Sequence, residues 1–390
     1  MISNTTNIAN GILGQLKSQE QEMLSFLKEL VALESPSRNP ESQHRILKFL
    51  EKELNGMGFY TMHVHGKKTG GYLYARPLKR DKRKPLQLMV GHCDTVWELD
   101  TLASMPLKDD GKTLSGPGVY DMKAGLTQII FALKTLDKMD LSLPLTPIIL
   151  INSDEEIGSR ESKFAIARLS KISERAYIME PPLGLEGKLK TARKGIGRFT
   201  ITVKGKAAHA GLDPDKGASA ILELSHQIQQ LYAMNDFDKG ITVNVGMVQG
   251  GVSPNVVAPE SKAVVDVRVL NKKDGEEITK RILSLRPTMP EVEVHIEGRI
   301  GRPPMEHTKG NRMLWRLAKA KGSLLGLDLE EATAGGGSDG NTTSLYTATL
   351  DGLGTTGDGA HARHEHILLD EFPVRTALLA LLILAETGDK

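Results

Sequence analysis

Apolar residues recur along the chain with two different spacings, and each spacing predicts a different kind of element. Between residues 23 and 31 they follow the i, i+3, i+4, i+7 pattern of an amphipathic helix. A second helix is predicted to begin at Pro40, with Asn39 as its N-cap. Short apolar runs predict strands at residues 72–76, 85–90, 146–152 and 176–179. Helical patterns at residues 126–136 and 162–169 separate the last three runs, and this alternation predicts an α/β domain with a mostly parallel, doubly wound sheet.

The middle of the chain has a different order of elements. Strands and helices are predicted there in the order βαββαβ, at residues 199–203, 218–232, 241–248, 263–270, 273–285 and 292–296. This is the order of the ferredoxin-like split unit. Because a complete α+β unit interrupts the doubly wound pattern, we expect an inserted domain at residues 194–301, with residues 1–193 and 302–390 forming the other domain.

Composition and charge exclude several classes of protein. Of the 390 residues, 39% are hydrophobic and 25% are charged, which is ordinary for a globular protein. The 50 basic and 48 acidic residues nearly cancel, so we expect neither nucleic acid nor a membrane as a partner. The longest apolar stretch, residues 377–385, has about half of the ~18 residues that a membrane span needs. Residues 1–16 lack the pattern of a signal peptide, and the single cysteine permits no intrachain disulfide, so we expect a cytoplasmic protein.

Several predicted strands end in residues that can bind metal ions. The histidine and acids that follow these strands are His92, Asp94, Glu155, Glu156 and Glu180. Ligands in open α/β sheets bind beyond the carboxyl ends of the strands, so we expect these side chains to form one site. Two adjacent buried carboxylates are costly without cations, because one of them must take up a proton. In an extended chain, one of the adjacent pair Glu155 and Glu156 can bind metal while the other faces the substrate.

Two residues outside these strands extend the set. Asp121 follows a Gly-Pro-Gly turn, where it is either a helix N-cap or a carboxylate that bridges two metal ions. His361 follows a glycine-rich loop. A mixed set of this kind suits a pair of zinc-like ions, and its members are His92, Asp121, Glu156, Glu180 and His361. Asp94 lies on the same side of the extended chain as His92 and is expected to fix its tautomer, whereas Cys93 between them is expected to be a buried residue.

Five motifs in the chain resemble those of a known enzyme family. They are GHCDTV at residues 91–96, GPGVYDMK at 116–123, SDEEIGS at 153–159, GKAAHAG at 205–211 and GAH at 359–361. Over nearly its whole length the chain is similar to the dinuclear zinc peptidases and deacylases that include carboxypeptidase G, aminoacylase and succinyl-diaminopimelate desuccinylase. It most resembles the glutamate carboxypeptidase branch. The resemblance implies a hydrolase that cleaves the amide bond of a dipeptide or N-acyl amino acid with a free carboxylate.

The resemblance also implies a role for each member of the metal set. Asp121 would bridge both ions, His92 and Glu180 would complete one site, and Glu156 and His361 would complete the other. The two ions per subunit are expected to be zinc, with cobalt or manganese as alternatives. The peptide bond that follows Asp121 is expected to be cis, as it is in relatives.

Catalytic and positioning roles follow from the same resemblance. Glu155 would be the general base that takes a proton from the water shared by the two ions. Asp94 would orient the first histidine ligand. His209, on the inserted domain, would donate to the oxyanion in the active site of the partner subunit. The inserted domain would therefore act as a lid and dimerisation domain, and the active enzyme would be a homodimer.

The substrate is expected to be a small anionic peptide or N-acyl amino acid. By resemblance to the carboxypeptidase branch, the residues that would contact it are Arg268, Asn255, Lys188 and Arg302. The planar fork of Arg268 suits a terminal carboxylate. The chain departs from carboxypeptidase G at residues 193–195 and at Ser338, so the side-chain specificity is left open.

Other functions are compatible with parts of the sequence. Residues 336–340 match the G-x-S-x-G elbow of serine hydrolases, with Ser338, Asp358 and His361 as a possible triad. Residues 352–357 match G-x-G-x-x-G, although little helical periodicity follows. A deacylase or desuccinylase of the same family and a binding-only relative without turnover are further alternatives.

Overall fold

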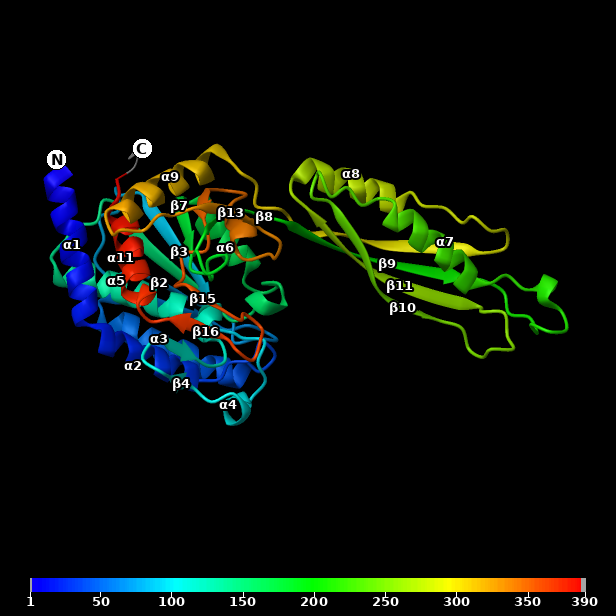
Figure 1. The fold of residues 1–390 in the computed structure, drawn as a ribbon, viewed down its shortest axis with the longest axis horizontal. Coiled ribbons are helices and arrows are strands. Elements are labelled where there is room, and N and C mark those ends of the chain that lie inside the picture. The colour runs from blue at the N-terminus through cyan, green and yellow to red at the C-terminus, as the bar shows by residue number, and fades with distance from the viewer. Residues whose placement is uncertain (1, 387–390) are drawn as a thin grey trace. The chain divides into compact units, whose positions relative to one another are not determined.

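The computed structural model describes residues 2–386 and divides into two compact units (Figure 1). Unit 1 contains the chain up to Thr191, then His307–Ala334, and then the chain from Ser338 onward. Unit 2 contains Ala192–Glu306 together with the three glycines Gly335–Gly337. The sequence pattern does not predict this grouping of the glycines, because they lie more than thirty residues beyond the inserted segment.

Unit 1 is built on a six-stranded sheet with the strand order β1-β2-β6-β3-β7-β14. In that order the strands are Phe59–Val64, Tyr72–Pro77, Thr146–Asn152, Leu86–His92, Ser173–Ile178 and Ala348–Leu350. The four strands from β6 to β14 are parallel, which confirms the predicted class. The edge strand β1 pairs antiparallel with β2, and β2 pairs antiparallel with β6. Strand β1 was not predicted, because it is only partly buried and its polar residues leave no continuous apolar run.

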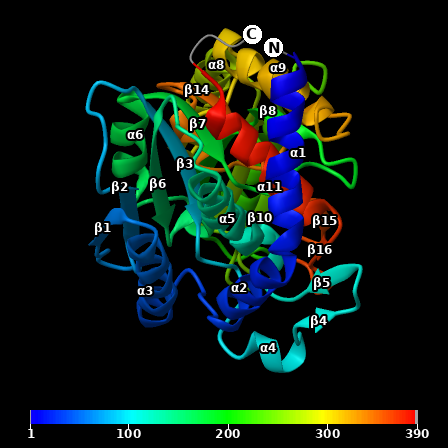
Figure 2. The ribbon, with the colours of Figure 1, turned by 90° about the vertical axis from the view of Figure 1, so that its left-hand side faces the viewer.

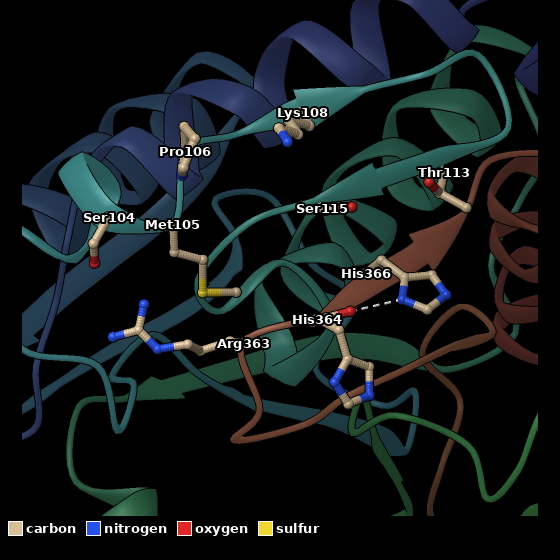
Figure 3. A pocket seen from close by; sticks show the side chains of 9 residues that line it. All are labelled: Ser104, Met105, Pro106, Lys108, Thr113, Ser115, Arg363, His364 and His366. Carbon is tan, nitrogen blue, oxygen red and sulfur yellow. Dashed lines mark hydrogen bonds between the residues drawn. The ribbon is translucent and has the colours of Figure 1, made fainter.

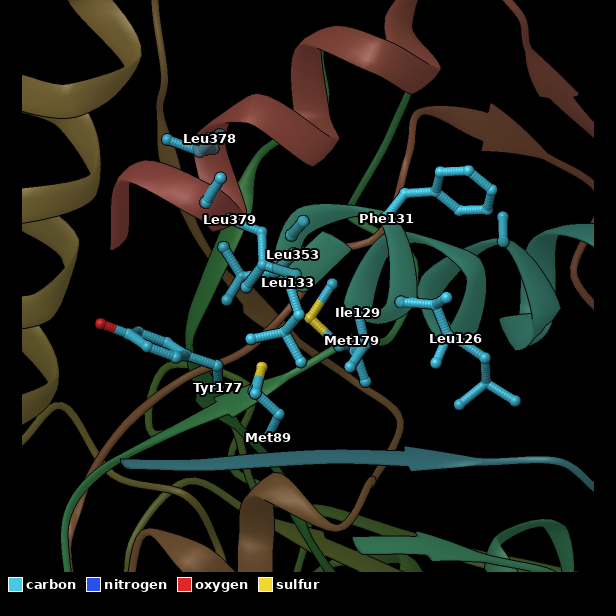
Figure 4. Packing of buried hydrophobic residues seen from close by; sticks show 14 of the residues in the cluster. Met89, Leu126, Ile129, Phe131, Leu133, Tyr177, Met179, Leu353, Leu378 and Leu379 are labelled. Atoms are coloured by element: carbon cyan, nitrogen blue, oxygen red, sulfur yellow. The ribbon is translucent and has the colours of Figure 1, made fainter. Parts of the chain in front are cut away.

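Helices cover both faces of this sheet, and the period-2 alternation of the strands assigns side chains to each face (Figure 2). The helices of unit 1 are α1 Ile2–Ser18, α2 Glu20–Ala32, α3 Pro40–Gly56, α4 Thr101–Ser104, α5 Ala124–Lys138, α6 Lys163–Lys171, α9 Lys309–Ser323, α10 Gly340–Thr343 and α11 Glu371–Leu384. Met89 and Tyr177 pack with α5 and α11 in the larger core (Figure 4). Their neighbours Leu88 and Ala176 face the smaller core beside α6.

The predicted helix boundaries in unit 1 are largely confirmed. The Asn39 side chain accepts a hydrogen bond from the backbone N–H of Ser42, as expected of an N-cap. Helix α3 continues through Gly56. The apolar stretch near the C-terminus forms most of α11, which is buried nearly all round. Within the described part of the chain, no helix is long and apolar enough to cross a membrane.

Short elements connect the main layers of unit 1. One small sheet has the order β15-β16-β5-β4, formed by Gly357–Asp358, His366–Leu368, Thr113–Ser115 and Lys108–Asp109. A two-stranded sheet pairs β8 Leu189–Arg193 with β13 Glu331–Ala334. A π-helical turn at Val119–Lys123 precedes α5, and a 3₁₀ turn at Glu155–Ile157 follows β6.

Unit 2 has the predicted βαββαβ order. Its elements are β9 Gly195–Lys204, α7 Ala220–Tyr232, β10 Thr242–Gly250, β11 Glu260–Val269, α8 Lys272–Leu283 and β12 Glu293–Arg302. The strands pair in the antiparallel order β10-β11-β9-β12, which is the ferredoxin-like arrangement. Helices α7 and α8 pack on this sheet (Figure 1), over a core that includes Phe199, Ile201 and Val265.

Candidate metal centre

Three adjacent strands of unit 1 deliver acids or a histidine to the same edge of the sheet. Strands β6, β3 and β7 are neighbours and run parallel, so their carboxyl ends lie together. His92 is the last residue of β3, and Glu180 follows β7. Glu155 and Glu156 follow β6 in a 3₁₀ turn, not in the extended conformation that the sequence predicted. The strand order therefore explains why residues far apart in the sequence meet at one site.

Two sets of possible metal ligands share one carboxylate. In the first, His92 Nε2 lies 3.2 Å from Asp121 Oδ1 and 3.5 Å from Glu180 Oε1. In the second, His361 Nε2 lies 3.0 Å from Glu156 Oε2 and 3.4 Å from Asp121 Oδ2. The three ligand atoms of each set lie within 4.8 Å of one another. The structure thus brings together all five residues that the sequence analysis grouped as metal ligands.

The backbone around Asp121 turns its carboxylate toward both histidines. Asp121 lies in the π-helical turn with non-helical dihedral angles, and Lys123 rather than Asp121 occupies the N-cap position of α5. The N-cap interpretation of Asp121 is therefore wrong. The peptide bond between Asp121 and Met122 is cis, as expected from the resemblance. Gly125 permits the close approach of α5 to the strand end, since a Cβ there would collide with the carbonyl oxygen of Met179.

Asp94 contacts both the first histidine and the acidic pair. Its backbone oxygen accepts a hydrogen bond from His92 Nδ1 at 2.9 Å, whereas its carboxylate is 3.5 Å from the same atom. The carboxylate accepts instead from the hydroxyl of Ser37 and from the backbone N–H groups of Glu155 and Glu156, at 2.7, 3.2 and 3.2 Å. Asp94 therefore fixes the His92 tautomer mainly through its carbonyl group, and its side chain holds the turn that carries the two glutamates.

The sequence analysis missed Glu365, which is a further carboxylate beside the centre. Its fully buried side chain accepts from the backbone N–H groups of Gly118, Tyr120 and Asp121 at 2.9–3.0 Å. It also accepts from the indole N–H of Trp97 at 2.8 Å. Burial raises the pKa of this carboxyl. Glu365 thus holds the backbone turn that contains Asp121. The sequence could have indicated Glu365 only through its position four residues after the proposed ligand His361.

The ionisable groups of the centre shift one another's pKa values strongly. Burial lowers the pKa of His92, but hydrogen bonds to Asp121, Asp94 and Glu180 outweigh it and hold this pKa well above 6.5. Contacts with Asp121 and Glu156 raise the pKa of His361 to about 10. Burial raises the pKa of Glu156 to about 7, while the two histidines hold that of Asp121 below its usual range despite burial. Protons on the histidines thus balance the buried carboxylates, and this oxygen-and-nitrogen donor set fits divalent metal ions.

His209 and Asn255 lie on paired segments of unit 2. Nδ1 of the exposed His209 accepts hydrogen bonds from the backbone N–H groups of Gly211 and Leu212, both at 3.2 Å. This arrangement leaves the proton on Nε2, so the ring can act as a donor. The backbone oxygen of Asn255 accepts from the N–H of Ala210 at 2.9 Å, which places Asn255 beside the His209 segment.

The predicted substrate-binding cations already have partners. Arg268 donates through Nε and Nη2 to the carboxylate of Asp266, at 2.7 and 3.2 Å. Lys188 forms an exposed ion pair with Glu330 at 2.9 Å. In unit 2, Arg193 Nη1 donates to two carbonyl groups of the glycine segment 335–337, and Arg302 packs against Gly337.

The structure removes two alternative interpretations. The buried hydroxyl of Ser338 donates to Asp351 at 2.6 Å and accepts from the backbone N–H of Gly340. Ser338 is therefore paired with an acid and not with His361, so the serine-hydrolase triad is wrong. The glycines at 352–357 lead into the short strand β15 instead of a helix, which contradicts a dinucleotide fingerprint. Cys93 is fully buried, and burial raises its pKa, as expected of a structural thiol.

A pocket of about 500 Å³ lies on the segment that follows His361 (Figure 3). Its lining includes Lys108 and Arg363 together with His364 and His366. The ring of His366 contacts the backbone oxygen of His364 at 2.8 Å, which fixes its orientation.

Comparison with known proteins places this geometry in a family. Residues 191–288 match the peptidase dimerisation domain of the M20 family. Carboxypeptidase G2 of Pseudomonas sp. (strain RS-16) is 29% identical over 391 residues, covering 96% of this chain and 92% of that protein. The expected family resemblance is confirmed: the chain is similar to M20 peptidases. The match to the dimerisation domain covers most of unit 2 and part of β8, so the inserted α+β unit is itself a family feature.

Solved structures share the M20 fold over nearly the whole chain. Aminopeptidase PepT from Bacillus cereus superposes with a TM-score of 0.80 at 22% identity, covering 93% of this chain and 98% of that one. A dinuclear metal-binding M20 peptidase from Bacillus subtilis superposes with a TM-score of 0.71 at 17% identity, covering 94% and 98%. Both likenesses support the α/β unit with an inserted dimerisation unit.

Proposed function

We propose that this M20 chain is a metal-dependent hydrolase of carboxypeptidase type. It would cleave the amide bond of a dipeptide or N-acyl amino acid that has a free C-terminal carboxylate. The observation that carries the proposal is the pair of histidine–carboxylate sets that share Asp121. The similarity to carboxypeptidase G2 along 96% of the chain supports the choice of substrate class.

The five residues of the two sets would hold two divalent ions, most simply zinc. His92 and Glu180 would bind one ion, Glu156 and His361 the other, and Asp121 both. Such a pair of ions lowers the pKa of a shared water and polarises the carbonyl oxygen of the scissile bond. Nitrogen and oxygen donors of this kind also bind cobalt and manganese, so the donor set alone does not select zinc.

Glu155 is the proposed general base. Its backbone N–H is held by the Asp94 carboxylate, so the turn that carries it is fixed to the end of β3. The carboxylate would take one proton from the attacking water as the new C–O bond forms. It would then pass this proton to the leaving nitrogen as the C–N bond breaks, so that no proton is gained or lost overall.

His209 is the proposed donor to the oxyanion. Its Nδ1 already accepts two backbone hydrogen bonds, so Nε2–H is the group that would donate to the developing negative charge. Following the family resemblance, this donor would come from unit 2 of a partner subunit. The active enzyme would then be a homodimer, which agrees with the dimerisation-domain match of residues 191–288.

Arg268 is the proposed contact for the substrate carboxylate. Its fork is engaged by Asp266, so the substrate would either displace Asp266 or bind the remaining edge of the guanidinium group. Asn255 would add a polar contact beside His209. Lys188 and Arg302 are further proposed contacts, and Lys188 would first have to leave Glu330.

The test is hydrolysis of a panel of dipeptides and N-acyl amino acids by metal-loaded protein, with and without a chelator. We expect chelator-sensitive release that is fastest for substrates ending in Glu or Asp. Glu155→Gln should lower kcat by about 10²–10⁴ with bound metal unchanged. A rate of release that depends on the acyl group but not on the C-terminal residue would favour a deacylase. No release by protein that carries two ions would contradict hydrolysis and favour a binding-only role.

A further inference from the structure

Three histidines outside the metal centre lie together between α3 and β1. His44 is on α3, His63 is on β1, and His65 follows the end of that strand. Their ring centroids are 5.4 Å apart for His44 and His63, 5.0 Å for His44 and His65, and 4.3 Å for His63 and His65. His44 and His63 are half-buried, and His65 is exposed. The cluster is therefore covered by protein around His44 and His63 and open to solvent at His65.

The ring nitrogens are spaced as a metal ion requires. One nitrogen from each of the three rings lies within 4.8 Å of the other two. Nδ1 of His65 is 3.3 Å from Nε2 of His44. In a tetrahedral site with Zn–N bonds of about 2.0–2.1 Å, two ligand nitrogens are about 3.3–3.4 Å apart. This pair therefore already has the separation of two ligands on one ion.

Hydrogen bonds around the cluster orient one of its rings and hold the neighbouring loop in place. Nε2 of His63 lies 2.8 Å from the backbone oxygen of Gly70, a contact that would fix its tautomer and leave a lone pair on Nδ1. Gly70 is held in turn by the fully buried side chain of Gln43, which accepts from its N–H at 2.5 Å. The carboxylate of Glu161 accepts from the backbone N–H groups of residues 67–69 in the same loop. The loop is thus held in place by contacts from other elements.

The three rings of the cluster influence one another electrostatically. Burial lowers the pKa of His44, and the neighbouring rings of His63 and His65 lower it further. Among the described residues, no acidic side chain forms an ion pair with any of the three. A metal ion would bind through the lone pair of each neutral imidazole ring.

We propose that His44, His63 and His65 form a separate site for a transition-metal ion of the zinc class, with water at the fourth position. Three imidazoles suit zinc, copper and nickel better than the hard ions magnesium and calcium, which prefer oxygen. The bound ion would join α3 to the end of β1. The site does not depend on the proposed hydrolase activity.

The test is to count zinc ions bound after dialysis at neutral pH, using elemental analysis. The Asp121→Asn variant serves as the parent, because it removes the shared carboxylate of the active centre. We expect this parent to keep one zinc ion per chain and to lose it when His65→Asn is added. His226→Asn, a change of a half-buried histidine in α7, is the matched control and should keep the ion.

Two further measurements separate loss of the site from loss of the fold. His65 is exposed, so His65→Asn should leave the metal-free melting temperature nearly unchanged. Added zinc should raise the melting temperature of the parent but not that of the His65→Asn form, because an ion that binds only the folded state stabilises it. Equal zinc content with and without His65→Asn would overturn the proposal. Hydrolysis by the native chain is scored separately, so either proposal can fail alone.

Discussion

The two histidine–carboxylate sets of the metal centre share Asp121 but differ in their backbone and burial. His92 ends a central strand, and its side chain is 1% exposed, while that of Glu180 beside it is 9% exposed. His361 lies in a loop with a positive φ of 62°, and its side chain is 51% exposed. Its partner Glu156 lies in a short turn. One set is therefore fixed by the sheet, whereas the other combines a buried glutamate, 7% exposed, with a histidine ring that is half in solvent.

Because of this difference, we expect the two proposed ions to exchange with solvent at different rates. Side chains at the ends of buried strands have few alternative rotamers, so their geometry is set before an ion arrives. An exposed loop histidine loses side-chain entropy when it binds an ion. We therefore expect the ion between Glu156 and His361 to exchange faster than the ion between His92 and Glu180.

The largest expected effect comes from Asp121→Asn, which acts on both sets at once. An amide is a poor bridge between two cations, so the variant should lose both ions of the centre and all measurable hydrolysis. Metal content and activity of the purified variant check this. Retention of one tightly held ion in the centre would show that the sets are independent and that Asp121 is not shared. The histidine cluster at residues 44, 63 and 65 must be removed in the same chain, so that its ion is not counted.

The next largest effect separates metal binding from turnover. His209→Asn should lower kcat by roughly 10²–10³, which is typical of losing one oxyanion donor, with both ions still bound. His295→Asn, another exposed histidine of unit 2, is the control and should leave kcat unchanged. An unchanged kcat in His209→Asn would sink the assignment. Mixing the His209→Asn and Glu155→Gln chains should restore part of the activity if the donor comes from the partner subunit.

A smaller effect tests the contrast in burial directly. His92→Asn removes a buried ring whose partners are left without a donor, which should cost about 1–3 kcal/mol of stability in the metal-free protein. His361→Asn changes a half-exposed ring, and its stability effect should stay within about 0.5 kcal/mol. Denaturant unfolding of both variants after chelation gives the comparison. Equal losses would mean that burial does not distinguish the two sets.

Much of this centre could be predicted from the sequence, because buried apolar strands that end in acids are a local pattern. The strand at residues 146–152 has the predicted bounds, and Glu156 after it reaches the site. The adjacency of β6, β3 and β7 could not be predicted strand by strand, since strand order depends on crossovers that no local pattern encodes. The roles of Asp121 and His361 within the set came from the resemblance to a family, because loop residues carry no periodicity.

Other features could not be predicted because they depend on side chains that meet only in the fold. Glu365 supports the Asp121 turn from more than two hundred residues away. The role of Asp94 was expected to come from its carboxylate, but its carbonyl oxygen is the nearer acceptor. The histidine cluster at residues 44, 63 and 65 was missed since its members lie on a helix face and on an edge strand with no shared motif.

The smallest expected effect concerns how pH acts on the metal-free protein. The pKa of His361 is raised from 6.5 to about 10 by Asp121 and Glu156, so between these values the folded state holds a proton that the unfolded state lacks. This contribution to stability is fully present below pH 6.5 and is lost as pH rises through about 10. Because His361 is half exposed, the change should be small, on the order of one degree in melting temperature. A metal ion replaces this proton, so the melting temperature of the metal-loaded protein should depend less on pH.

Melting temperatures measured from pH 6 to 10 with and without chelator check this. In the presence of chelator, the melting temperature of the His361→Asn variant should also depend less on pH. An equally steep profile in that variant would assign the titration to the buried set instead, and would remove the contrast between the two sets.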